Sequence, residues 1–137
     1  MEGSLRILVS VTPDALTRVI VHLLRNFPEI EIVSCVRGNE PLVRQAQRLL
    51  PHIIIVNCQE AVSGCGTTVD VLKNASPGSK LILTSWGDDF AVRRRLPNVD
   101  AHINEASLVR KLVPTVRKLC AAYGHSVSRR SNQRRYR

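Results

Sequence analysis

The side chains best placed to do chemistry are polar residues that follow apolar runs, where strands are expected to end. Thr12 follows LRILVSV, Asn57 follows IIIV, and Ser85 ends KLILTS. None of them stands in a pattern that suggests a nucleophile with its base, and paired carboxylates or a phosphate-binding glycine loop are missing where the fold would need them. Because these arrangements are missing, we expect no enzyme activity, no cofactor and no metal.

The cysteines are scattered along the chain, at Cys35, Cys58, Cys65 and Cys120. They form no CxxC pair, and no histidine lies at metal-ligand spacing from them. Cys35, Cys58 and Cys120 stand beside apolar residues of expected strands or helices. We therefore predict free, buried thiols in a reducing compartment, with a disulfide or a zinc site as the alternatives.

The basic charge is concentrated near the C-terminus. Residues 1–105 hold 11 Lys/Arg and 11 Asp/Glu, so the net charge of +9 lies entirely in the rest of the chain. The terminal segment carries Arg129, Arg130, Arg134, Arg135 and Arg137. Such a tail could contact about five nucleic-acid phosphates, with strong salt dependence, or serve only as a solubilising terminus. No helix-turn-helix pattern accompanies it, so we expect no sequence-specific reading of DNA.

Apolar runs alternate with segments of helical period five times. The expected strands are 5–11, 29–36, 53–56, 80–85 and 100–103, with 53–56 central and 29–36 nearer an edge. The first expected helix begins near Thr12, and the next three span 40–50, 67–75 and 88–96. A last helix is expected to be capped by Ser107 and interrupted at Pro114. This alternation predicts an α/β, flavodoxin-like (βα)5 doubly wound domain over residues 4–122, with a five-stranded parallel sheet and helices on both faces. Residues 123–137 are expected to form a basic, disordered tail.

The same segments resemble the receiver domain of bacterial response regulators, a CheY-like fold. The similarity rests on RILVSVTPD, LLPHIIIVN, KLILTSW and VDAHINEAS, which match the ends of four receiver strands. A working receiver uses an acidic pair to hold Mg²⁺, an aspartate as phosphoryl acceptor, a switch hydroxyl and a lysine. The corresponding residues here are Val11 and Thr12, Asn57, Ser85, and either Asn104 or Glu105. The resemblance therefore implies a degenerate pseudo-receiver without the acceptor, the metal ligands or the cation.

Three further positions have two interpretations each. Trp86 stands where receivers usually carry Ala or Gly, so we expect it to fill the phosphoryl space or the core, with a partner-binding role as the alternative. His102 either occupies the aromatic switch position of receivers or is a half-buried histidine, which we favour. Arg93–Arg95 lie on the surface that receivers commonly use for docking, or form a solvated basic face.

The function indicated is a phosphorylation-independent module for signal transduction or transcription regulation. It would bind a protein partner through the face made by helix 88–96, strand 100–103 and the last helix, with a homodimer as one form. The alternative is a nucleic-acid-associated protein that uses the arginine tail, with the domain as dimerisation platform. A weaker third option is a small ligand bound at the carboxyl ends of the strands, near Val11, Thr12, Asn57 and Ser85.

Composition places the chain among ordinary globular domains, at 44% hydrophobic and 23% charged residues. No apolar run approaches the roughly 18 residues of a membrane span. The N-terminus carries an acid where a signal peptide has a basic region. We therefore expect a cytoplasmic protein without a membrane partner.

Overall fold

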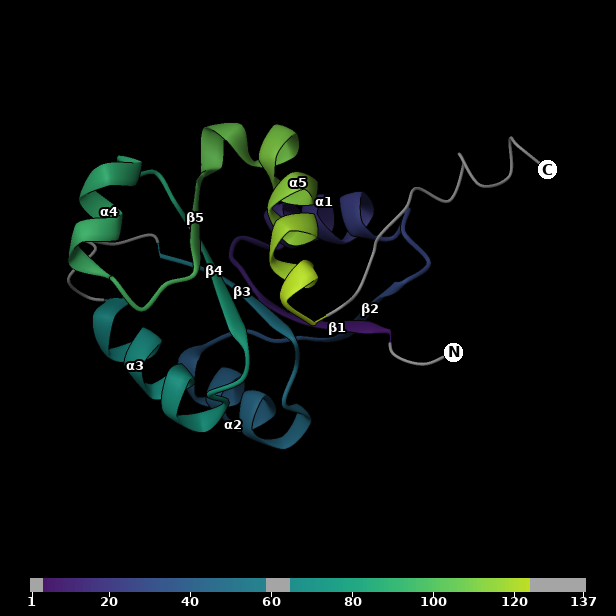
Figure 1. The fold of residues 1–137 in the computed structure, drawn as a ribbon, viewed down its shortest axis with the longest axis horizontal. Helices are drawn as coiled ribbons and strands as arrows, with labels where there is room; N and C mark the ends of the chain where they lie inside the picture. The colour runs from purple at the N-terminus through teal and green to yellow at the C-terminus, as the bar shows by residue number, and fades with distance from the viewer. Residues whose placement is uncertain (1–3, 59–64, 124–137) are drawn as a thin grey trace.

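The computed structural model describes residues 4–58 and 65–123, which form one α/β domain (Figure 1). Its strands are β1 (Leu5–Ser10), β2 (Ile30–Cys35), β3 (Ile53–Asn57), β4 (Lys80–Ser85) and β5 (Ala101–Asn104). They pair in parallel in the order β2-β1-β3-β4-β5. This confirms the flavodoxin-like class, with β3 central and β2 at an edge as predicted.

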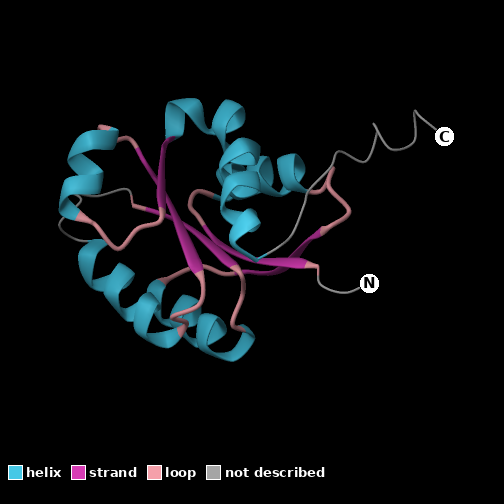
Figure 2. Cartoon of the chain, viewed as in Figure 1, coloured by secondary structure: helices cyan, strands magenta, loops and turns pink. Residues whose placement is uncertain are grey.

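Helices cover both faces of the sheet (Figure 2). They are α1 (Asp14–Leu24), α2 (Asn39–Leu49), α3 (Gly66–Ala75), α4 (Asp89–Arg95) and α5 (Leu108–Cys120). Helices α1 and α5 pack on one face, and α2, α3 and α4 pack on the other. Alternating strands and helices give this arrangement because each crossover between parallel strands must lie on a sheet face.

The central strand shows why the sheet needs both helical layers. Ile53, Ile54 and Ile55 are completely buried. Since successive side chains of a strand point to opposite faces, Ile53 and Ile55 pack against α1 and α5, whereas Ile54 packs toward α2, α3 and α4. The unbroken β-branched run is therefore the sequence signature of a strand buried on both sides.

The caps of the helices differ from the prediction in part. Ser107 occupies the N-cap of α5 but makes no capping hydrogen bond. Instead Asn104 accepts from the Ala106 N–H at 2.9 Å, in the 3-10 turn that precedes α5. Asp88 caps α4 by accepting from the Ala91 N–H at 3.1 Å. These side chains fix the entry of two helices that flank β5.

The described chain ends on an anchored residue, Tyr123. Its hydroxyl donates toward the carbonyl oxygens of His52, at 2.8 Å, and Gly78, at 2.7 Å. Its ring also packs edge-on against the imidazole of His52. Within the two described ranges, no helix is long and apolar enough to cross a membrane.

Candidate functional site at the carboxyl edge of the sheet

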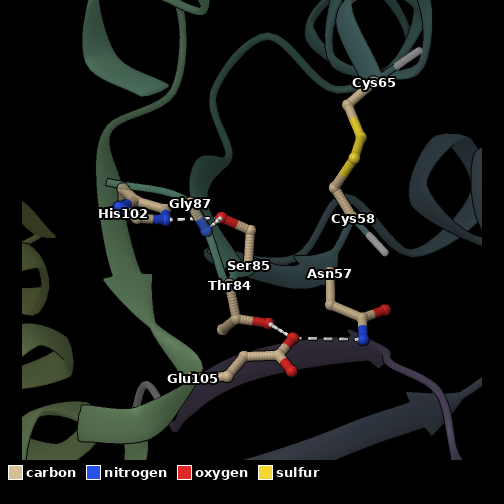
Figure 3. Close-up of a disulfide and its surroundings, with 8 residues drawn as sticks. All are labelled: Asn57, Cys58, Cys65, Thr84, Ser85, Gly87, His102 and Glu105. Atoms are coloured by element: carbon tan, nitrogen blue, oxygen red, sulfur yellow. Dashed lines mark hydrogen bonds between the residues drawn. A yellow bond between two sulfur atoms is a disulfide. The ribbon is translucent and has the colours of Figure 1, made fainter. Parts of the chain in front are cut away.

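The polar residues that follow the strands meet at one edge, because parallel strands all end on the same side. Asn57 ends β3, and its neighbour β4 supplies Thr84, which pairs with Asn57 in the sheet. Thr12 follows β1, and Glu105 follows β5. Figure 3 shows Asn57, Thr84 and Glu105 joined by hydrogen bonds. The structure therefore brings together Thr12, Asn57 and Glu105, which the sequence singled out at three strand ends, and adds Thr84 from a fourth.

Asn57 is held in place by both atoms of its amide. Its Oδ1 accepts from the Thr12 N–H at 3.2 Å, and its Nδ2 donates to the Thr12 carbonyl at 2.5 Å. Nδ2 also lies 3.4 Å from Oε2 of Glu105. An amide can both accept and donate in this way, whereas a carboxylate can only accept. Asn57 is thus a hydrogen-bonded residue at the end of a strand.

Glu105, and not Asn104, faces Asn57. The Glu105 carboxylate accepts from Thr84 Oγ1 at 3.1 Å as well as from Asn57. The Asn104 side chain turns away, since its Nδ2 donates to the Gly87 carbonyl at 3.1 Å. The sequence left these two residues as alternatives for the degenerate lysine position. The side chain that reaches the centre of the site is an acid, and Thr84 is a participant that sequence reasoning missed.

A second hydrogen-bonded chain runs from Ser85 through His102 to Asp89. Ser85 Oγ lies 2.8 Å from His102 Nε2, and His102 Nδ1 lies 3.1 Å from Asp89 Oδ1. The Gly87 N–H donates to Ser85 Oγ at 3.0 Å, so the serine hydroxyl can donate its own proton to Nε2. The imidazole has 0% exposure, so the prediction of a half-buried histidine is wrong. Hydrogen bonds to its two polar partners offset the desolvation of the buried imidazole.

The order serine, histidine, aspartate resembles that of a hydrolase triad, but the surroundings do not suit one. Ser85 is buried at 3% exposure. Ser85 lines neither the cavity beside Asn57 nor a second one bordered by Val43 and Val71. A nucleophile needs room for a substrate beside it. The chain of contacts therefore fixes the end of β4 against β5 and α4.

Asp89 is the solvent-facing end of this chain of contacts. Its slight burial raises the pKa of the carboxyl. Hydrogen bonds from His102 and Arg93, together with the Arg93 charge, lower the pKa by more than burial raises it. The net result is a pKa below the usual range for aspartate. Asp89 is therefore ionised at neutral pH and suited to accept from the imidazole.

A cavity of about 330 Å³ opens beside Asn57, between α2 and α3. Its polar lining comes from Ser10, Thr12, Asn39, Asn57 and Thr68, and none of the described residues that line it is charged. Val11, which precedes Thr12 in the chain, is buried in the core.

Trp86 does not fill the phosphoryl space, contrary to the prediction. Its side chain is exposed at 68% because the residue before it, Ser85, points inward and the chain turns outward. Phe90, on α4, is exposed at 69%, and the Arg94 guanidinium lies 5.7 Å from its ring centre. Arg93–Arg95 are all exposed. No sequence pattern indicated that Phe90 is exposed, since a helix as short as α4 shows no apolar stripe.

Two of the cysteines are paired, so the prediction of four free thiols is wrong. Cys58 and Cys65 form a disulfide with a Cα–Cα distance of 6.2 Å, within the ordinary range (Figure 3). Cys35 and Cys120 are not part of this disulfide, and Cys120 is buried as expected, but Cys35 is exposed. Partial desolvation raises the pKa of both thiols. The pair was missed because the two cysteines are 7 residues apart and form no CxxC motif.

The predicted nucleic-acid contacts fall outside the described residues: Arg129, Arg130, Arg134, Arg135 and Arg137. Across residues 4–58 and 65–123, no cluster of three His, Cys, Asp or Glu side chains could hold a metal ion.

Comparison with known proteins finds likeness in structure alone. No protein-family model and no curated protein matches the sequence. The receiver domain of AraT from Geobacillus stearothermophilus is similar at a TM-score of 0.74 and 14% identity, covering 88% of this chain and 96% of that one. The NarL receiver domain of Mycobacterium tuberculosis gives 0.71 and 14%, covering 90% and 99%. The response regulator domain of Thermotoga maritima CheB gives 0.70 and 13%, covering 84% and 95%. The chain therefore has the receiver fold.

Proposed function

We propose that this protein is a pseudo-receiver, a signalling module that works through protein contacts and independently of phosphorylation. The observation that carries this proposal is the set of hydrogen bonds that holds the Asn57 amide. Its amide is hydrogen-bonded to both backbone groups of Thr12, and the acid of Glu105 lies against it. The acceptor position is thus occupied by a group that cannot attack phosphorus, and its neighbour is an anion that would repel a phosphoryl donor.

The metal requirement supports the same proposal. A receiver-type reaction needs Mg²⁺ to neutralise the phosphoryl oxygens, and Mg²⁺ needs several oxygen ligands with negative charge nearby. Val11 is an apolar core residue, and Thr12 interacts with Asn57 through its backbone. The Glu105 carboxylate, the acid that contacts Asn57, already accepts from Thr84 and Asn57.

Binding of Mg²⁺ is the first test of this proposal. We expect a titration with MgCl₂, followed by amide chemical shifts, to leave Thr12, Asn57 and Glu105 unperturbed beyond general salt effects. CaCl₂ at matched ionic strength is the control for those effects. Saturable shifts of these three amides with Mg²⁺ alone would show that a metal site survives, and the proposal would then be wrong.

The face made by α4, β5 and α5 is our candidate for partner binding. Trp86 and Phe90 present exposed aromatic surface at its start, and aromatic residues contribute strongly at protein interfaces. Val109 adds a third exposed apolar side chain on α5. His102 and Ser85 link this face to the carboxyl edge through their hydrogen bond. A partner protein or a second copy of the chain would dock here.

A nucleic-acid role for the C-terminal arginines is the second candidate, and the charge of α5 favours it. Arg110, Lys111, Arg117 and Lys118 are all exposed on that helix, which leads into the arginine segment. We expect the full chain to bind duplex DNA or RNA more tightly than a chain ending at Gly124, with the difference shrinking as salt rises. Retention on immobilised nucleic acid at low and moderate salt measures this. Equal retention of both chains would show that the arginine segment does not contribute to nucleic-acid binding.

A further inference from the structure

The disulfide lies directly beside the degenerate acceptor position. Cys58 follows Asn57 in the chain, and both cysteines line the cavity that Asn57 also lines (Figure 3). The Cys58 N–H donates to the Thr84 carbonyl at 3.0 Å, so backbone pairing holds Cys58 to β4 whatever the state of its sulfur. Cys65 occupies the N-cap of α3. The bond therefore ties the start of α3 to the end of β3.

The short span of the bond argues against a purely structural role. The two cysteines are 7 residues apart. A cross-link restricts the unfolded chain less when it closes a short loop than a long one. The rest of α3 is anchored independently, since Val69 and Leu72 are buried in the core. Breaking the bond would thus release only the first turn of α3 and the cavity wall.

The two sulfurs also differ in access. Cys58 is buried, whereas Cys65 is partly exposed. The greater exposure of Cys65 favours attack from solvent at its sulfur. The N-terminus of a helix carries partial positive charge, which stabilises the Cys65 thiolate released in the second step of a reduction.

We propose that Cys58 and Cys65 form a reversible thiol–disulfide site that reacts with dithiols and small disulfides and sets the shape of the adjoining cavity. A dithiol reductant attacks Sγ of Cys65 as a thiolate, forming a mixed disulfide and releasing the Cys58 thiolate. The second thiolate of the reductant then attacks the reductant sulfur that is bonded to Cys65 and releases the Cys65 thiolate. The reductant becomes a disulfide, and two electrons and two protons end on the cysteines. Oxidation by glutathione disulfide runs the same exchange in reverse. This proposal does not depend on whether Asn57 can be phosphorylated.

The test is a redox titration of the native protein. The wild-type chain is equilibrated in mixtures of reduced and oxidised dithiothreitol, quenched in acid, unfolded and alkylated, and its thiols are counted by intact mass. We expect two alkylated cysteines under oxidising conditions and four under reducing ones, with the same curve approached from either side and circular dichroism unchanged. Reduction only after addition of denaturant would make the bond structural. Failure of the thiols to pair in oxidising buffer would also overturn the proposal.

Matched variants separate this pair from the other thiols. The variant Cys35→Ser should keep the transition, with one alkylated cysteine fewer in each state, whereas Cys65→Ser should lose it. Hydrogen exchange then reports on the cavity wall. We expect the amides of Val69–Val71, which bond to the first turn of α3, to exchange faster in the reduced protein, whereas β1 and β3 do not change. Identical exchange at Val69–Val71 in both states would refute the conformational part of the proposal.

Discussion

Substituting Asn57→Asp, which restores a carboxylate at the acceptor position, is expected to destabilise the protein by about 2 kcal/mol near neutral pH. The aspartate cannot donate to the Thr12 carbonyl or to Glu105, as the Asn57 amide does. Its oxygen would instead face a carbonyl oxygen and a second carboxylate. Urea unfolding of both chains measures the loss. An Asn57→Asp chain as stable as the wild type would mean that the hydrogen bonds of the Asn57 amide contribute nothing to the free energy of unfolding.

The pH dependence of this variant separates charge repulsion from a packing defect. Two neighbouring acids hold a proton more tightly when folded than when unfolded, so the pKa of the new carboxyl would be raised in the folded state. Because that pKa is raised, the loss of folding stability is present at pH values above the folded-state pKa. The loss disappears as the pH falls and the acid protonates. We therefore expect the stability gap to narrow in mildly acidic buffer. Adding Glu105→Gln should narrow it at neutral pH as well, since a neutral amide replaces one of the two charges.

Substituting His102→Ala is expected to cost about 3 kcal/mol of folding free energy. The side chain has 0% exposure, so its removal leaves a cavity between β5 and α4. It also removes a partner from Ser85 and another from Asp89. The unfolding midpoint in urea reports the loss, with the m-value expected to be unchanged.

The exposed His22 on α1 provides a matched control for this variant. His22→Ala makes the same chemical change at the surface and should alter stability by less than about 0.5 kcal/mol. Ser85→Ala should cost less than His102→Ala, because it removes only a hydroxyl. Equal effects of His102→Ala and His22→Ala would contradict the buried position of the imidazole.

The fold could be predicted from local patterns because the strands are so different from the helices. The run at 53–56 is β-branched throughout, which favours a strand buried on both faces, and the edge strand at 29–36 alternates as expected. The positions at the strand ends were predictable too, since a parallel sheet brings those ends together. That is why Asn57 and Glu105 meet although they are 48 residues apart.

Side-chain direction and pairing were not predictable in the same way. The patterns placed Trp86 next to a buried serine but did not show that it turns to solvent. They left Asn104 and Glu105 as equivalents because a shift of one residue reverses which side chain faces inward. The Cys58–Cys65 bond depends on the path between β3 and α3, on which periodicity carries no information. Each of these features is decided by tertiary geometry.

Phosphoryl transfer to the wild-type chain is the measurement that tests the central claim most directly. The protein is incubated with acetyl phosphate and Mg²⁺ beside a receiver domain that keeps its acids, and both are examined by intact mass. We predict that the control gains one phosphoryl group and that this chain keeps its mass. A stable phosphoryl adduct on this chain would contradict the account, whatever residue carried it.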